Sequence, residues 1–480
     1  MDKKLEQEKL EKLQKQIADS GHGKPVTRRE LLGQGLISGS AFVIAPSLLG
    51  SIYSQSAMGQ DALAKSCPAD DGGSASLGAI VVELAGGGNL AGGNVFVGGR
   101  GGQSDILPAG SYSSLGGAPG TAVKQYGLLW NPASKFMVGL NTAITDQAVR
   151  DKVKGILFCS TSENDTNNNS YIPTHQLVHA GAMGEVAKLV GTAGGLNGAR
   201  SNKTTPFIEP GLTAVSISKS ADAISIVAKS DLAQTLGDES INKIMKATSL
   251  MGSDALCNIS RRSLSEQMAA VCGCRYDKSY SLATKFGVDS IDPLKDTGIT
   301  AIYGAQANEA EATISKLVVS GLAGVGVIVK GGYDYHGQAR TATDAKDQDA
   351  GLTVGRIIAY AAKQNRPVTV IVVTDGGVSS NDSGMWSSDS SQRSSALQFS
   401  YHPKGTQVQA SKDPQIGAYK ADGTADKTVN AIGDNTTNLA LAFTANYLAL
   451  KGDEKRLATL FGANPISQKL EEYLVFSKSM

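Results

Sequence analysis

Short apolar runs rich in β-branched residues alternate along the chain with longer segments of helical periodicity. Runs of four to eight such residues bounded by glycine or polar residues are typical of buried strands, and the longer segments are typical of helices. The predicted strands are 79–84, 155–159, 324–329 and 368–373, and the predicted helices are 175–190, 308–320, 345–364, 439–450 and 455–461. Strands that alternate with helices predict an α/β fold with a mainly parallel sheet flanked by helices.

Residues 200–300 follow this alternation less clearly. Residues 212–217 alternate as a half-exposed strand does, and residues 240–251 and 263–271 have helical spacing. The segment from 61 to 480 is long enough for one large α/β domain with insertions or for two domains. We therefore interpret residues 200–300 as a helical insertion into a single domain that spans residues 61–480.

The first 60 residues carry a different pattern. Arg28 and Arg29 lie within Thr27-Arg28-Arg29-Glu30-Leu31-Leu32 and precede a weakly apolar stretch of 17 residues, 33–49, that several glycines and Pro46 interrupt. This arrangement predicts a twin-arginine export signal. Because a bilayer core of roughly 30 Å needs about 20 apolar residues, we expect a cleaved signal and no permanent membrane anchor. The predicted location is the bacterial periplasm or the outside of the cell, with the twin-arginine export machinery as a partner.

The net charge bears on the class of binding partner, and the cysteines bear on disulfides and metal binding. The chain has 45 basic and 44 acidic residues and a net charge of +1, which gives no reason to expect nucleic acid as a partner. Its five cysteines all follow the signal, where an oxidising compartment permits disulfides. The closest group, Cys257, Cys272 and Cys274, has no histidine nearby, which favours a local disulfide over a thiolate metal site.

A glycine-rich loop follows the first predicted strand. From residue 86 to residue 120, thirteen of thirty-five residues are glycine, and no helical or strand periodicity is present. Loops of this length are either functional or simply flexible. The sequence leaves both interpretations open.

Candidate ligands for a metal follow two later strands. Strand 324–329 leads into Gly331-Gly332-Tyr333-Asp334-Tyr335-His336, and strand 368–373 ends in Thr374-Asp375. The carboxyl ends of neighbouring parallel strands meet at one sheet edge, where ligands bind in open α/β sheets. Two carboxylates and an imidazole suit zinc or a similar divalent ion. The alternative is that Asp334 caps a turn and that His336 is a satisfied surface residue.

These motifs resemble those of domain of unknown function family 1501, bacterial proteins with twin-arginine signals that are distantly similar to the alkaline phosphatase and sulfatase superfamily. Residues 331–336 are similar to that family's Gly-Gly-aromatic-Asp-Thr-His, and 374–376 to its Ser/Thr-acidic-aromatic-Gly. Thr174-His175 resembles its Ser-His after an Asn/Pro-rich loop. The resemblance covers most of the mature chain and implies an alkaline-phosphatase-like fold. It also implies Thr174 as the nucleophile and Asp334, His336, Asp375 and His175 as metal ligands.

The chain departs from the family at two ligand positions. Asn89 stands where the family has an aspartate, with Asp105 the next one downstream, and Tyr401-His402-Pro403 is only a weak substitute for the family's late Asp-His-Gly. A two-metal site needs its charged ligands around ions about 3.5–4 Å apart. We therefore expect one divalent metal, zinc or similar, or equally no metal. His179, one helical turn beyond His175, is either a further ligand or a packing residue.

Two functions are compatible with these observations. The first is an exported, metal-dependent hydrolase that cleaves a small phosphate or sulfate ester. The alternative is a non-catalytic protein that keeps the fold and binds an envelope, secretion or surface partner. The missing ligands favour the alternative.

Overall fold

The computed structural model describes residues 77–118, 121–161, 173–192, 212, 214–227, 243, 247, 291–304, 308–374, 376–380, 383–387 and 393–480. All of these except 243 and 247 belong to one unit of the chain. The predicted export signal, four of the five cysteines and nearly all of the predicted helices at 240–251 and 263–271 lie outside the described residues. Within the described residues, no helix combines the length and apolarity needed to cross a membrane.

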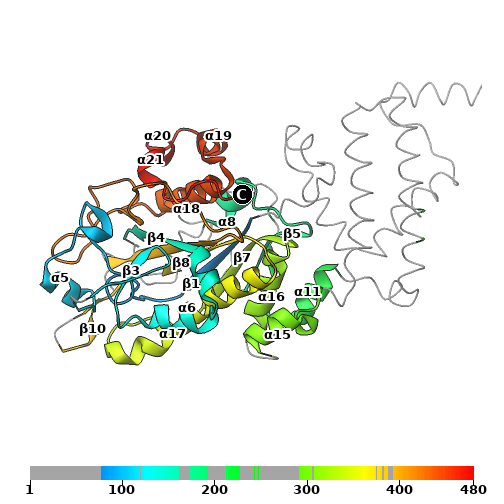
Figure 1. Cartoon of the computed structure of the whole chain (residues 1–480), viewed down its shortest axis with the longest axis horizontal. Helices are drawn as coiled ribbons and strands as arrows, with labels where there is room; N and C mark the ends of the chain where they lie inside the picture. Colours follow the sequence, from blue (N-terminus) through cyan, green and yellow to red (C-terminus); the bar gives the residue numbers. More distant parts are fainter. Residues whose placement is uncertain are drawn as a thin grey trace, which may run out of the picture. The chain divides into compact units, whose positions relative to one another are not determined.

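The centre of the described fold is a sheet in the order β12-β4-β11-β8-β1-β7-β5-β6 (Figure 1). Every neighbouring pair is parallel except those of β11, which runs antiparallel to both β4 and β8. The mainly parallel α/β fold is therefore confirmed. The strands are β1 (Gly78–Leu84), β4 (Val153–Cys159), β5 (Ala187–Gly191), β6 (Ala214–Ser216), β7 (Ala323–Lys330), β8 (Val368–Thr374), β11 (Ser395–Tyr401) and β12 (Gln415–Ile416).

Helices cover both faces of this sheet, which is why its central strands are mostly apolar (Figure 1). One face carries α8 (Thr174–His179), α18 (Thr436–Lys451) and α19 (Leu457–Phe461), and the other carries α6 (Lys135–Ala143), α16 (Glu309–Val319) and α17 (Arg340–Lys363). Alternation along β1 sends Ala79 and Val81 into the core beneath α8 and α18. By the same alternation, Glu83 belongs to that face.

The remaining elements are short. They are β2 (Val123–Gln125), β3 (Leu128–Trp130), β9 (Ser379–Ser380), β10 (Trp386–Ser387), α5 (Ala109–Ser114), α7 (Gln147–Lys152), α11 (Ser220–Val227), α15 (Thr297–Tyr303), α20 (Pro465–Gln468), α21 (Leu470–Tyr473), η2 (Gly102–Ser104), η3 (Pro293–Lys295) and η5 (Glu454–Arg456). β2 and β3 form a hairpin, and so do β9 and β10. Both hairpins lie outside the central sheet.

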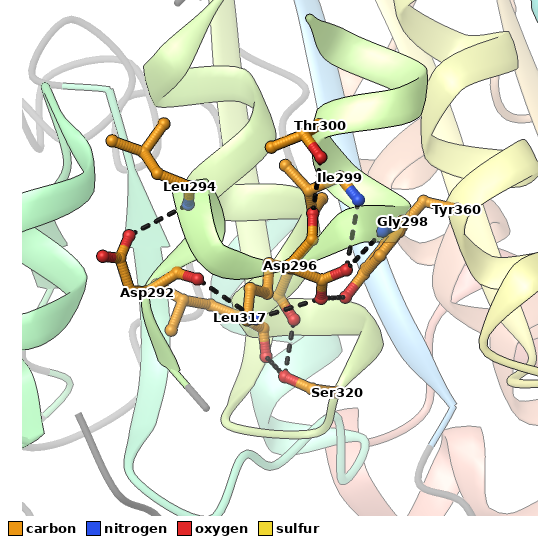
Figure 2. Close-up of polar contacts among 10 residues, drawn as sticks. Asp292, Leu294, Asp296, Gly298, Ile299, Thr300, Leu317, Ser320 and Tyr360 are labelled. Carbon is orange, nitrogen blue, oxygen red and sulfur yellow. Dashed lines mark hydrogen bonds and ion pairs between the residues drawn. The ribbon is translucent and has the colours of Figure 1, made fainter. Parts of the chain in front are cut away.

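A buried ionic network joins the helices on the α16–α17 face (Figure 2). Asp296 begins α15, where its carboxylate accepts the N–H groups of Gly298 at 2.8 Å and Ile299 at 3.2 Å. The same carboxylate accepts from Lys316 Nζ of α16 at 3.0 Å and from the Tyr360 hydroxyl of α17 at 2.8 Å. One side chain therefore caps a helix and fixes its position against two others.

One predicted helix was wrong, and one strand was not predicted. The helix predicted at 175–190 ends at His179, because the chain turns at Gly181 with φ of 91° and then forms β5. β5 is a buried strand between β7 and β6, so pairing decided a segment whose periodicity was ambiguous. β11 was not predicted, because its polar residues obscured a strand whose seven residues are all buried. The half-exposed strand predicted near 212–217 is confirmed as β6.

Candidate functional site

The carboxyl ends of β1, β4, β7 and β8 meet at one edge of the sheet. Because β11 is antiparallel, its first residues lie at the same edge, where Ser395 pairs with Cys159 of β4. The loops that follow β1 and β7 and the start of α8 carry most of the candidate residues to this edge. The prediction that strands 324–329 and 368–373 are neighbours was wrong, because β1 lies between β7 and β8. Both strands are parallel to β1 and therefore end at the same edge.

The glycine-rich loop begins between the ends of β7 and β8. The Tyr333 N–H donates to Ala85 O at 3.1 Å, and the Tyr335 N–H donates to Gly87 O at 3.2 Å. On the other side, the Gly88 N–H donates to the Thr374 hydroxyl oxygen at 3.1 Å. Gly86 has φ of 120°, and a Cβ there would lie 2.2 Å from the Asp334 nitrogen. Glycine is required at this position because the two loops approach each other through their backbones.

Asp334 and His336 lie on the outer side of the loop after β7 (residues 331–338, the β7 loop). Both side chains are exposed, and the Asp334 carboxylate accepts the His336 N–H at 3.0 Å. Tyr333 and Tyr335 alternate with them and are buried against α17. This is the turn-capping arrangement that the sequence left as the alternative. Asp375, the third predicted ligand, lies outside the described residues.

Thr174 and His175 open α8 and are both buried. The Thr174 hydroxyl has no hydrogen-bond partner among the residues that the structure describes. His179, at the other end of the helix, packs its ring edge-on against Phe461 at 5.4 Å. His175 as a metal ligand stays a prediction, and the contact with Phe461 agrees with a packing role for His179.

Glu83 is a buried carboxylate that was not among the candidate residues predicted from the sequence. It lies in the central strand, is 2% exposed, and pairs across the backbone with Val329 of β7. A charged residue inside an apolar strand pattern was the available signal.

Four buried polar atoms at this edge have no hydrogen-bond partner within the described part of the chain. Each belongs to a residue no more than 2% exposed. A buried unsatisfied polar atom costs about 1–3 kcal/mol, and native proteins hold few of them unless a water or ligand completes the bonding. These atoms are Asn89 Oδ1, Ser160 Oγ, Thr174 Oγ1 and Ser395 Oγ.

The described residues do not fit a two-metal centre. No group of three or more histidine, cysteine, aspartate or glutamate side chains in the described ranges is arranged to hold a metal ion. Asp105 accepts the Gly101 N–H at 3.0 Å in an exposed turn. Tyr401 pairs with Val153 and Val368, at the first residues of β4 and β8, so His402 lies at the opposite edge of the sheet from the β7 loop. Burial, assisted by Lys404, lowers the pKa of His402.

Comparison of the chain with protein-family models and with curated proteins gives no match. The resemblance to domain of unknown function family 1501 and to the alkaline phosphatase superfamily therefore stays a prediction. The described geometry establishes the α/β fold and a polar sheet edge, on which the functional proposal below is based.

Proposed function

We propose that this chain is an exported binding protein that holds a small, hydroxyl-bearing ligand at the carboxyl edge of its sheet and catalyses no metal-dependent reaction. The observation that carries the proposal is the set of four unsatisfied buried atoms at that edge, from Asn89, Ser160, Thr174 and Ser395. They come from four segments, yet all lie near the ends of β1, β4, β11 and the start of α8.

The chemistry of these atoms favours hydroxyl groups on the ligand. An asparagine carbonyl oxygen only accepts hydrogen bonds, whereas serine and threonine hydroxyls both donate and accept. A ligand with several hydroxyls can donate a hydrogen bond to the Asn89 carbonyl oxygen. The same hydroxyls can either donate to or accept from the hydroxyls of Ser160 and Thr174. Each bond formed would remove a penalty of about 1–3 kcal/mol that the unliganded protein otherwise bears or relieves with water.

The outward direction of the Asp334 and His336 side chains supports binding without metal-dependent catalysis. Asp334 and His336 are exposed and bonded to each other through the His336 backbone N–H. Asn89, at the position where the resemblance implies an aspartate, is neutral and buried. A binding role in the envelope, including docking of an envelope protein partner, is compatible with such an edge.

The second candidate is the metal-dependent hydrolase of phosphate or sulfate esters. One observation favours it: Thr174 is the first residue of α8, and its hydroxyl is not engaged by any described residue. The resemblance implies a nucleophile at this position. Asp375, one of the implied ligands, lies outside the described residues, so one divalent metal stays a prediction.

Two measurements on the mature protein separate the candidates. The first is the change in melting temperature on adding simple sugars and polyols, for the natural chain and for Thr174→Val and Ser160→Ala. A rise that both variants reduce supports binding. The second is metal content by mass spectrometry with an ester-cleavage panel, compared with Asp334→Ala and Asp375→Ala. Bound metal and cleavage that these substitutions abolish would overturn the binding proposal in favour of the hydrolase.

A further inference from the structure

A buried carboxyl on α17 connects the two loops that form the candidate edge. The Tyr335 hydroxyl, from the β7 loop, donates to Asp347 Oδ1 at 2.7 Å. The Asn94 side chain, from the glycine-rich loop, also acts on this carboxyl and favours its ionised form. Trp386 packs on the Tyr335 ring at 6.1 Å and donates its indole N–H to Thr343 of α17 at 3.0 Å. Two loops therefore meet at Asp347, and Trp386 packs on the Tyr335 ring of one of them.

Asn94 fixes the glycine-rich loop at the same point. Its amide nitrogen donates to Asn89 O at 2.9 Å, and its carbonyl oxygen accepts from the Ser134 hydroxyl at 2.9 Å. A change at Asp347 is therefore transmitted to Asn89, one of the four unsatisfied residues at the edge. Tyr335 transmits it to the turn that holds Asp334 and His336.

The charged groups around Asp347 do not neutralise it. On its own helix lies Asp344, whose carboxylate is 3.9 Å from Lys135 of α6. Tyr333 of the β7 loop contacts Asp349 at 3.1 Å and carries Lys346 over its ring at 5.5 Å. Asn94 and Trp386 bring no charge. Burial therefore dominates and raises the pKa of Asp347 to about 7.

We propose that Asp347 is a proton-controlled latch that holds the β7 loop and the glycine-rich loop against α17 when its carboxyl is protonated and releases them when it ionises. The docked form binds the proton more tightly than a solvated aspartate with its ordinary pKa near 4, so by linkage the proton favours docking. Ionisation favours the opened form because only there does water reach the carboxylate. The latch goes beyond the proposed function and does not depend on the ligand.

Hydrogen exchange of the full mature chain, corrected for the intrinsic effect of pH, measures this opening. In peptides covering 86–95 and 331–338, we expect the opening equilibrium to rise about tenfold per pH unit between pH 5 and 7 and to level off above 7. Asp347→Asn should remove the pH dependence of loop opening. Asp334→Asn changes an exposed carboxylate of the β7 loop and should leave that pH dependence unchanged. In a peptide covering β8, hydrogen exchange should report a far smaller opening equilibrium at every pH.

Each contrary result would overturn the latch. These results are a flat wild-type profile, an Asp347→Asn profile that follows the wild type, and exchange in β8 that matches exchange in the loops. If Asp347→Asn does not fold, carbon-13 NMR titration of the Asp347 carboxyl in the natural chain decides. A midpoint near 7 supports the latch, and a midpoint near 4 rules it out.

Discussion

The hydroxyl of Tyr360 on α17 donates a hydrogen bond to the carboxylate of Asp296 at 2.8 Å, across the start of α15 (Figure 2). Lys316 of α16 forms an ion pair with the same carboxylate at 3.0 Å. Both charged side chains, Lys316 and Asp296, are largely buried. Burial acts to raise the pKa of Asp296, but the bonds from Tyr360, Lys316 and the Ile299 N–H outweigh it and lower the pKa. The ionised carboxylate is therefore part of the folded state at neutral pH.

Removing the Lys316 ammonium group should leave the Asp296 carboxylate buried without its positively charged partner. We expect Lys316→Met to lower the free energy of unfolding by about 3 kcal/mol, measured by urea denaturation at pH 7. Arg456 and Asp453 form a matched exposed pair at 3.2 Å. Arg456→Met should therefore change stability by less than about 1 kcal/mol. Equal effects of the two substitutions would contradict the assignment of the Asp296 network as a stabilising one.

Acidification should weaken the stabilisation that the Asp296 network provides. Because the folded pKa of Asp296 lies below its unfolded value, its contribution is present above about pH 4 and is lost as pH falls through the folded value. We expect Asp296→Asn to be less stable than the natural chain at pH 6 and to lose less stability between pH 5 and 3. Parallel pH profiles of the urea midpoint for the two proteins would disprove this prediction.

Asp347 should show the opposite dependence. Its folded pKa of about 7 exceeds the unfolded value, so its contribution is favourable below about pH 4 and declines as pH rises to 7. Over this range the loss is on the order of 4 kcal/mol if the carboxyl stays buried. We expect Asp347→Asn, which keeps an oxygen for Tyr335, to gain stability relative to the natural chain between pH 5 and 7.5. Thermal denaturation across this range measures the difference.

Close contact between α6 and α17 leaves no room for a side chain at Gly351 of α17. A Cβ on Gly351 would lie 2.0 Å from Phe136 O, a backbone atom that cannot move freely. Alanine normally stabilises a helix interior by about 1 kcal/mol over glycine, yet we expect Gly351→Ala to destabilise by several kcal/mol. Gly331 has open space around it, so Gly331→Ala is the control and should be tolerated. A stable Gly351→Ala protein would contradict the packing.

Two threonines at the sheet edge offer a matched pair of substitutions. Thr174 has an unsatisfied hydroxyl, whereas the Thr374 hydroxyl accepts from the Gly88 N–H at 3.1 Å and lies 3.1 Å from Gly86 O. In ligand-free protein, we expect Thr174→Val to be neutral or stabilising by roughly 1 kcal/mol and Thr374→Val to destabilise by about 1–3 kcal/mol. Calorimetry measures both. Destabilisation by Thr174→Val would mean that its hydroxyl is already satisfied.

The candidate site was predictable only in part. Gly331-Gly332 and Thr374-Asp375 showed from sequence order that their loops follow strands at one edge. The sequence did not show that Tyr333 and Tyr335 occupy the buried positions and leave Asp334 and His336 exposed, because that alternation depends on where α17 lies. Nor did it indicate that His402 lies at the far edge, since this follows from the antiparallel direction of β11.

Local patterns in the chain determined the α/β class, the positions of β1, β4, β7 and β8, and the long glycine-rich loop, because periodicity and glycine content act over a few residues. Tertiary structure alone decided that β5 is a strand, that the Glu83 carboxyl is buried, and that Asp347 joins two distant loops. These outcomes depend on which segments pack together. Burial and the hydrogen bonds available there set the conformation and charge of such residues, and no local pattern records either.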